Sequence, residues 1–302
     1  MLDKSLIVIV GPTAVGKTTV SIELAQRLSC SIISADSRQL FKEMRIGTAK
    51  PSIDEMQGVK HYFVDDRSIE KDFSAGKFER EALEVLNKEF IDKNVSLLVG
   101  GSGFYIDALC LGLNDFPEIK PNVRNELNSE LLEGGVEKLY QRLKIVDPQY
   151  AEEIEANNSQ RIIRALEIFE SSGKTYSSLR LGLDAKRNFN IYYIGLEMDR
   201  ALLYERINTR MDQMIAEGLF EEAIDLINFR DKNALQTVGY NEVFMYQDGL
   251  IDKKEAIRLL KRNSRRYAKR QLTWFKRNDE IKWFHPDNVD KIYNYLEEKL
   301  HT

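Results

Sequence analysis

The first chemically informative residues are Gly11–Thr18 (GPTAVGKT), which have the spacing GxxxxGK[ST] and directly follow an apolar run. Glycines at both ends let the backbone N–H groups between them point inward at phosphate oxygens. A helix beginning here adds partial positive charge, Lys17 a full charge, and the Thr18 hydroxyl a ligand for Mg²⁺. We predict a phosphate-binding loop made of Gly11, Pro12, Thr13, Ala14, Val15, Gly16, Lys17 and Thr18.

This motif serves kinases, ATPases and GTPases alike, so it indicates phosphate or nucleotide binding (ATP included) and no particular reaction. The alternative interpretation, a glycine turn without a ligand, is disfavoured because the motif requires a preceding strand and a following helix, and both patterns are present.

A carboxylate, Asp36, ends the second apolar run, and the hydrogen-bonding side chains of Ser37, Arg38 and Gln39 follow it. A second glycine cluster, 100–103, comes directly after a later apolar run. In open α/β sheets ligands bind at the carboxyl ends of the strands, so we expect these segments and the phosphate loop to face one crevice. A helix N-cap and a Mg²⁺-associated carboxylate remain alternatives for Asp36 at this point.

Strands and helices must alternate to position these residues. Continuous apolar runs of strand length are typical of parallel sheets that are buried on both faces. Strands are predicted at 6–10, 31–35, 62–64, 95–99, 191–196 and 281–284, and helical patterns include 22–28 and 82–91. The predicted fold class is therefore α/β, with a parallel sheet flanked by helices.

The alternation stops near Pro117. Beyond it the patterns are helical, with a break at Gly134-Gly135 and a strong helix at 159–170 that ends at Gly173. We predict an all-helical insertion at 116–186 within a core made of 1–115 and 187–302.

The chain has a net charge of −4 but contains one strongly basic segment. Residues 253–277 contain eleven Lys or Arg and one acidic residue, a net +10, which leaves −14 for the rest of the chain. Apolar residues recur at helical spacing, so the basic side chains are expected on the opposite face. Most runs of charged residues simply form a solvated helix face. A segment with this much positive charge in an otherwise acidic chain instead favours contact with phosphates.

Cysteine usage and the N-terminus indicate the cytoplasm. Cys30 and Cys110 are the two cysteines and form no CxxC pair, so a disulfide framework or a zinc site is not expected. The apolar run at the start is too short to span a membrane, and no cleavage region follows it.

Several segments together carry a more specific signal. GPTAVGKT, ADSRQLFKEMRIGTAKP, LLVGGSGFYIDAL, QRIIRALEIF, RINTRMDQMIAEGL, QTVGYNE and RRYAKRQLTWFKR occur in this order over nearly the whole chain. They resemble the tRNA dimethylallyltransferase family, also called tRNA isopentenyltransferases. The resemblance implies a P-loop NTPase-like core with a helical insertion. Eukaryotic members often add a C-terminal zinc finger, which this sequence lacks, so the bacterial type is expected.

The resemblance also implies an activity. Dimethylallyl diphosphate donates its dimethylallyl group to N6 of the adenosine 3′-adjacent to the tRNA anticodon, and pyrophosphate leaves. Asp36 is implied as the base that accepts the N6 proton, and Thr18 as an aid to the pyrophosphate and to Mg²⁺. Arg210 is implied as the arginine that neutralises the pyrophosphate, with Arg206 as its competitor.

The expected partners are the tRNA anticodon stem-loop and the prenyl diphosphate, without a membrane, and the expected state is a monomer. Trp274 keeps the alternative of packing in the core or at its rim. The tRNA contacts implied by the resemblance are Asp36, Ser37, Arg38, Gln39, Ser102, Arg124, Gln160, Arg161, Ile162, Ile163, Arg164, Gln236, Thr237, Val238, Gly239, Tyr240, Asn241, Lys269, Arg270, Gln271, Trp274 and Lys276.

Two other functions share parts of this pattern. A small-molecule or nucleotide kinase would use the same phosphate loop, but it explains neither the basic segment nor the helical insertion. A non-catalytic RNA-binding NTPase explains the basic segment but gives Asp36 no role. Transfer of a labelled prenyl group to RNA without ATP separates both from the prenyltransferase.

Overall fold

The computed structural model describes residues 4–114, 116–120, 122–180 and 186–301. The chain divides into two compact units, a larger one of Met1–Cys110 with Lys186–Thr302 and a smaller one of Leu111–Ala185. The smaller unit begins at Leu111, against 116 in the sequence-based prediction.

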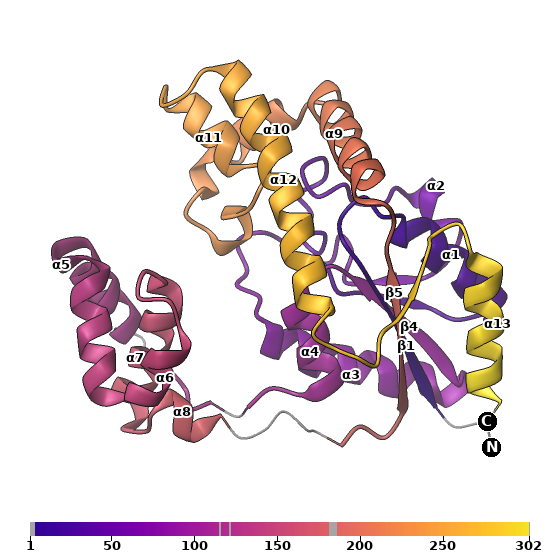
Figure 1. Ribbon diagram of the computed structural model, residues 1–302, viewed down its shortest axis with the longest axis horizontal. Coiled ribbons are helices and arrows are strands. Elements are labelled where there is room, and N and C mark those ends of the chain that lie inside the picture. The colour runs from indigo at the N-terminus through magenta and orange to yellow at the C-terminus, as the bar shows by residue number, and fades with distance from the viewer. Residues whose placement is uncertain (1–3, 115, 121, 181–185, 302) are drawn as a thin grey trace. The chain divides into compact units, whose positions relative to one another are not determined.

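A parallel sheet is the centre of the larger unit (Figure 1). In the described part of the chain it has six strands in the order β3-β2-β4-β1-β5-β6. This arrangement confirms the predicted α/β class. The strands are β1 Ser5–Val10, β2 Ile32–Ser34, β3 His61–Tyr62, β4 Val95–Gly100, β5 Asn190–Leu196 and β6 Lys282–Phe284.

The sheet forms because its central strand is apolar on both faces. Every residue of β1 is buried. Successive side chains of a strand point to opposite faces, so Leu6 and Val8 pack into one core while Ile7 and Ile9 pack into the other. Helices α1 and α13 supply the second core, and α3, α4 and part of α12 supply the first. The sheet is therefore covered on both faces, as parallel sheets require.

The helices of the larger unit surround the sheet and extend beyond its carboxyl edge, where α12 runs beside α9 and α11 (Figure 1). None of the helices in the described residues is both long and apolar enough to cross a membrane. Their bounds are α1 Lys17–Arg27, α2 Ile53–Met56, α3 Ala75–Asp92, α4 Gly103–Leu111, α9 Arg200–Ala216, α10 Leu219–Asp225, α11 Asn241–Gln247, α12 Lys253–Phe275 and α13 Val289–Leu300, with short 3-10 turns at Ile227–Phe229 and Asn233–Leu235.

Two predicted elements differ from those observed. The strand predicted at 62–64 is β3, which ends at Tyr62 because Phe63 has φ 61°, a left-handed conformation that cannot continue a strand. The helix predicted at 82–91 begins earlier, at Ala75, because the hydroxyl of Ser74 caps it by accepting from the N–H of Lys77.

In its described residues, the regular elements of the smaller unit are all helices. It contains α5 Val123–Val146, α6 Pro148–Glu153, α7 Ser159–Ser172 and α8 Tyr176–Leu179. Gly135, at φ 73°, interrupts α5 where the paired glycines predict a break. Gly173, at φ 72°, ends α7 in a left-handed cap, as predicted. Residues 181–185, within the predicted insertion, lie outside the described residues.

Candidate active site

The phosphate loop connects β1 to α1 and depends on two glycines. Gly11 has φ 151° and Gly16, which precedes α1, has φ 109°, conformations that other residues rarely adopt. A Cβ on Gly11 would lie 2.7 Å from the carbonyl oxygen of Leu196 in β5. The loop therefore lies against the neighbouring strand, with the N-terminus of α1 directed at the space that an anion would fill.

Lys17, the first residue of α1, is anchored below the loop. Its Nζ donates to the carbonyl oxygens of Gly11, at 2.9 Å, and Pro12, at 2.8 Å. Burial lowers the pKa of Lys17 to about 7; the charge of Asp36 opposes this shift and that of Arg210 adds to it. An ammonium group has three hydrogens, so one remains for a bound phosphate.

Gln271 of α12 connects the phosphate loop to the second glycine cluster. Its Oε1 accepts from the N–H of Thr13 at 2.8 Å, and its Nε2 donates to the carbonyl oxygen of Gly101 at 3.0 Å. The residue is only 6% exposed. Both ends of the amide therefore bind protein backbone inside the site. Gln271 also lines the main cavity, and its contact with tRNA stays a prediction.

Asp36 lies next to the phosphate loop because β2 and β4 are very close at their carboxyl ends. A Cβ on Gly100 would lie 2.3 Å from the carbonyl oxygen of Ala35, so only glycine fits there. The N–H of Ser102 then donates to that carbonyl at 3.2 Å, and the Ser102 hydroxyl accepts from the N–H of Ser37 at 3.0 Å. This contact brings the two predicted strand-end segments together.

The Asp36 carboxylate both shapes its own turn and lines the site. Its Oδ1 accepts from the N–H groups of Arg38, at 2.9 Å, and Gln39, at 3.2 Å. Residues 37–40 form a turn, so Asp36 caps a turn and not the helix that the N-cap alternative required. This role occupies one oxygen of the carboxylate. The residue also lines the main cavity, so capping and chemistry are compatible.

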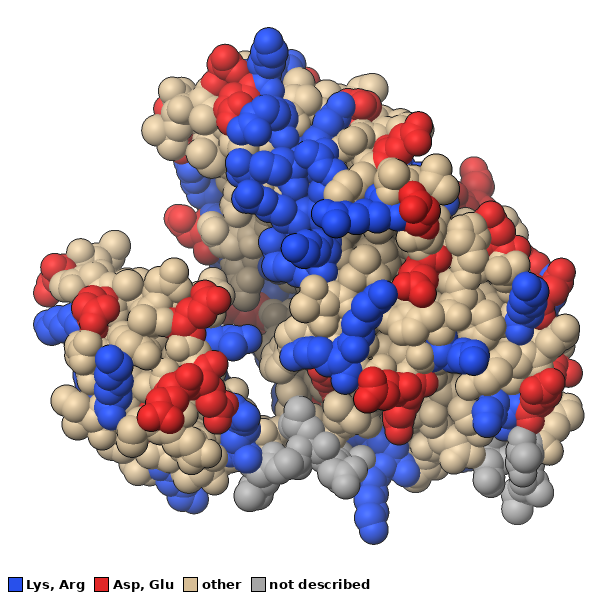
Figure 2. Space-filling model, in the orientation of Figure 1, with Lys and Arg blue, Asp and Glu red and all other residues tan. Residues whose placement is uncertain are grey.

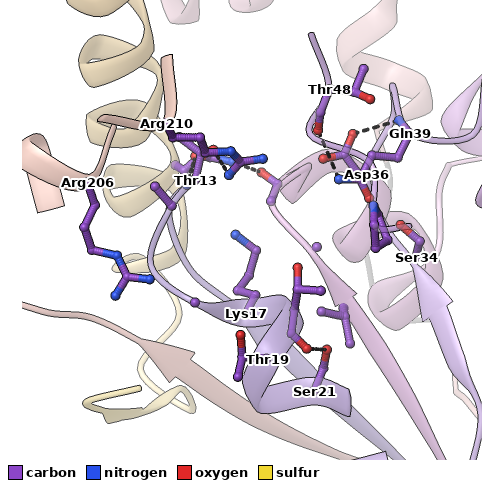
Figure 3. Close-up of a pocket in the computed structure, with 18 of the residues that line it drawn as sticks. Thr13, Lys17, Thr19, Ser21, Ser34, Asp36, Gln39, Thr48, Arg206 and Arg210 are labelled. Atoms are coloured by element: carbon purple, nitrogen blue, oxygen red, sulfur yellow. Dashed lines mark hydrogen bonds between the residues drawn. The ribbon is translucent and has the colours of Figure 1, made fainter. Parts of the chain in front are cut away.

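Two arginines of α9 lie beside the phosphate loop (Figure 3). Arg210 is half-buried, and its Nη1 donates to the Thr13 hydroxyl at 3.3 Å. Burial lowers the pKa of Arg210, and the negative charge of Asp36 raises it. Arg206 lies at the other end of the loop, 3.8 Å from the position that a Cβ on Gly16 would take. Arg206 and Arg210 thus both face the phosphate site.

A cavity of about 540 Å³ brings these groups together. Figure 3 shows Thr13, Lys17 and the two arginines on one side of it and Asp36, Gln39 and Thr48 on the other. In the described residues, no cluster of three His, Cys, Asp or Glu could hold a metal ion by itself.

A smaller, more apolar pocket of about 100 Å³ adjoins the same carboxylate. Asp36 and Arg210 line both cavities. The apolar lining comes mainly from α9 and from the segment before α11, namely Ile207, Met211, Met214 and Val238. An apolar group attached to an anion in the loop could enter this pocket.

A third hollow of about 600 Å³ contains several residues that the sequence predicts to contact tRNA. It lies between the turn after Asp36 and the face of α12. Among the predicted residues that line it are Ser37, Arg38, Gln236, Thr237, Val238, Asn241 and Arg270.

The segment 236–241 does not place all of its residues in this hollow. Gly239 is buried, and Tyr240 is fully buried with its hydroxyl donating to Glu222 at 2.7 Å. The Tyr240 ring fills the space over Gly47, and contact of this residue with tRNA stays a prediction.

The remaining predicted residues of α12 differ in exposure. Lys269 and Arg270 are exposed. Lys276 forms an ion pair with Glu197 at 3.1 Å. Trp274 is partly buried against Gly103, and its Nε1 donates to Asp107 at 3.1 Å, which supports the packing alternative for this residue.

In the smaller unit, α7 carries the predicted residues 160–164 on two faces. Gln160 and Arg161 are exposed, whereas Ile162 and Ile163 are buried in the core of that unit. Those two isoleucine side chains form the apolar face of an amphipathic helix, and contact of residues 160–164 with tRNA stays a prediction. Arg124 and Arg164 both pair with the buried Glu167, the former at 2.8 Å.

Two residues of the site, Tyr267 and Thr48, lie in segments that carry the resemblance, but the sequence does not single them out. Tyr267 lines all three hollows, and burial raises the pKa of its hydroxyl to about 12. Thr48 lines two of them and binds Gln39 through its backbone carbonyl. The helical spacing of Tyr267 with Ser264 and Gln271 indicates a shared face, but it gives no chemistry.

Comparisons with known proteins agree with this geometry. The family model described as IPP transferase matches residues 39–278. A tRNA dimethylallyltransferase of Cytophaga hutchinsonii is 49% identical, over 99% of this chain and 98% of that protein. One of Christiangramia forsetii is 47% identical over the full length of both.

Solved structures give the same result. The tRNA isopentenylpyrophosphate transferase of Bacillus halodurans aligns with a TM-score of 0.73 and 40% identity, covering 99% of this chain and 97% of that one. A eukaryotic dimethylallyltransferase acting on tRNA aligns with a TM-score of 0.79 and 25% identity, covering 95% and 75%. The resemblance seen in the sequence is confirmed, and the chain belongs to the IPP transferase family.

Proposed function

We propose that this chain transfers the dimethylallyl group of dimethylallyl diphosphate to N6 of the adenosine 3′-adjacent to the anticodon of tRNA and releases pyrophosphate. The single observation that carries the proposal is one cavity lined by the phosphate loop, by Arg210 and by the Asp36 carboxylate. The names of the curated relatives support it. We also propose a cytoplasmic location, since tRNA is the proposed substrate, and a monomeric state.

The reaction needs a cradle for the leaving group and an acceptor for a proton. The diphosphate lies in the loop, where the α1 N-terminus, Lys17 and Arg210 stabilise the charge that develops as its bond to the prenyl carbon breaks. The adenine amino group attacks that carbon, and its proton passes to Asp36. One N–C bond forms, one C–O bond breaks and no phosphoryl group moves.

The prenyl group is proposed to occupy the smaller pocket. Its walls of Ile207, Met211, Met214 and Val238 are apolar, while Asp36 and Arg210 stand where it meets the main cavity. This arrangement keeps the hydrocarbon out of water and its reactive carbon near the carboxylate.

The oxygen ligands that the site offers fit a Mg²⁺ ion that arrives with the substrate. Mg²⁺ is usually bound by a few protein oxygens, waters and substrate phosphates, and Thr18 offers its hydroxyl at an exposed position of the loop. When bound, the ion would neutralise charge on the diphosphate.

The tRNA is proposed to bind along the basic face of α12, defined here as Arg258, Lys261, Arg262, Arg265, Arg266, Lys269 and Arg270. Figure 2 shows a dense band of Lys and Arg over this helix. Some of these charges are already paired, for example Lys261 with Asp212 at 2.6 Å. Lys269 and Arg270 are both exposed and near the hollow beside Arg38.

Replacing Lys269 and Arg270 together with alanine should weaken tRNA binding and reduce its dependence on salt. When a phosphate contact is lost, fewer counterions are released on binding. The magnitude of the slope of the log binding constant against log salt concentration should therefore fall by roughly 0.7–0.9 per contact. Filter binding of an anticodon stem-loop at several salt concentrations measures this slope.

A matched control removes one Arg and one Lys from elsewhere in the same unit. Arg80 and Lys88 are exposed on α3, and their double alanine variant should keep the parental slope. Equal slopes for both double variants would show that the basic face of α12 does not touch phosphate.

The direct test of the proposed function is incubation with unmodified tRNA and labelled dimethylallyl diphosphate in the absence of ATP. Label should enter RNA and digest as a nucleoside alkylated at N6. An enzyme that leaves the label in the diphosphate, with active tRNA and Mg²⁺ present, lacks the proposed activity.

A further inference from the structure

The carboxylate of Glu222, which does not line the cavities described above, binds the backbone N–H groups of the turn 45–47. Glu222, on α10, accepts from the N–H of Arg45 at 2.9 Å and of Ile46 at 2.7 Å through Oε2. Its Oε1 accepts from the N–H of Gly47 at 2.9 Å and from the hydroxyl of Tyr240 at 2.7 Å. Consecutive N–H groups bound by one carboxylate fix the conformation of this turn, because charge-assisted hydrogen bonds are the stronger ones.

Packing reinforces the same contact. Tyr240 is fully buried, and a Cβ on Gly47 would lie 2.6 Å from its ring. Only glycine lets the turn approach the ring this closely. Glu222, Tyr240 and Gly47 come from three segments far apart in the sequence, and they meet at one point.

The two residues that follow this turn bind the side chain of Gln39. The amide Nε2 of Gln39 donates to the carbonyl oxygens of Thr48, at 3.1 Å, and Ala49, at 3.2 Å. Both hydrogens of that nitrogen are therefore used. The amide cannot flip without losing both bonds, so the oxygen Oε1 is the atom left for the cavity that Gln39 and Asp36 both line.

An adenine amino group has two hydrogens. In the proposed reaction, Asp36 takes one of them. A second acceptor fixed nearby would bind the other, which orients the nitrogen lone pair toward the prenyl carbon and discriminates against purines without the amino group.

We propose that Glu222 is a positioning residue for the reacting amine: it fixes the turn 45–47, and through the Thr48 and Ala49 carbonyls it fixes Gln39 as a second hydrogen-bond acceptor beside Asp36. This inference rests on the proposed function. Glu222 itself touches no substrate.

The test uses Glu222→Gln, which keeps the side-chain size but replaces one carboxylate oxygen with an NH₂ group. That group faces backbone N–H donors, so at least one bond to the turn is lost. Binding is measured for two stem-loops, one with adenosine and one with purine riboside at the target position. The preference of the parent for adenosine should fall by roughly 3- to 10-fold in the variant, since a hydrogen bond to a neutral group is lost.

Purine riboside lacks the amino group, so its affinity should stay within about twofold of the parental value if only the amine contact is affected. The adenosine preference should also fall in Gln39→Ala, and the double variant should be no worse than Gln39→Ala alone, because both residues act through one contact. A purely structural role for Glu222 would instead lower both affinities together and add to the effect of Gln39→Ala.

Glu221→Gln is the matched control, since Glu221 is the exposed neighbour on α10 and its loss removes the same charge. It should keep the parental preference. An unchanged preference in Glu222→Gln, or additive losses in the double variant, overturns the inference. Prenyl transfer by the parent is assayed alongside, so a parent that transfers label but shows no coupling rejects this inference alone, and an inactive parent rejects the proposed function.

Discussion

Asp36→Asn should slow the single-turnover transfer step by roughly 10²–10⁴, the usual effect of removing a general base. The substitution is conservative in this structure. The asparagine Oδ1 can still accept from the N–H groups of Arg38 and Gln39, so the turn after β2 remains intact. What is lost is the ability to take the amine proton.

The measurement is rapid-quench transfer with enzyme in excess over the stem-loop, together with separate affinities for donor and RNA. Donor affinity must be measured, because the Asp36 charge raises the pKa of Lys17 and its removal weakens the phosphate site at neutral pH. A near-parental rate at saturating donor would mean that Asp36 only positions the adenine and that another group, or water, accepts the proton.

Lys17→Met should weaken dimethylallyl diphosphate binding by roughly 10- to 100-fold, which corresponds to one hydrogen bond between charged groups. Methionine keeps the length and packing of the stem beneath Gly11 and Pro12 but provides no charge. Titration with the donor in the absence of RNA measures the effect, and tRNA affinity should be unchanged. Parental donor affinity in this variant would show that the loop is not the donor site.

The same lysine should make donor binding depend on pH. Its pKa in the free enzyme is lowered to about 7 by burial. Below that pH the ammonium is already charged; above it, the diphosphate must bind with uptake of a proton. Affinity should therefore fall as the pH rises from 7, by at most tenfold per unit.

The diphosphate titrates as well, so Lys17→Met is the control for the donor's own ionisation. The difference between the pH profiles of parent and variant isolates Lys17. Parallel profiles above pH 7 would show that the lysine stays charged in the free enzyme.

Local sequence patterns were sufficient for much of the fold. The buried run in β1, the glycines of the phosphate loop and the end of a helix at Gly173 each depend on residues a few positions apart, and each was predicted. The end of β3 at Phe63 was not, because the conformation that stops the strand is imposed by its surroundings and has no signal of its own.

The segment from Asp36 to Pro51 shows the limit for the site. The sequence identifies this segment as functional, but it does not separate chemistry from support. In the structure Asp36 and Gln39 line the cavity, whereas Lys50 is buried with its Nζ donating to the carbonyl oxygen of Phe41 at 2.6 Å. Gly47 supports the site by letting Tyr240 approach and by donating its N–H to Glu222.

By itself, the sequence determined the α/β class, the phosphate loop, the family and the segments that form the site, because short-range periodicity and fixed spacing encode them. Only the tertiary structure decided which side of each segment faces the cavity. Gln271, Tyr240 and Ile162 are buried, although they lie in segments that the resemblance connects with tRNA, and Glu222 binds the backbone of a turn far away in the chain. The physical reason is that burial and hydrogen bonding between distant segments are set by how helices pack on the sheet, and such contacts leave no periodic trace in the sequence.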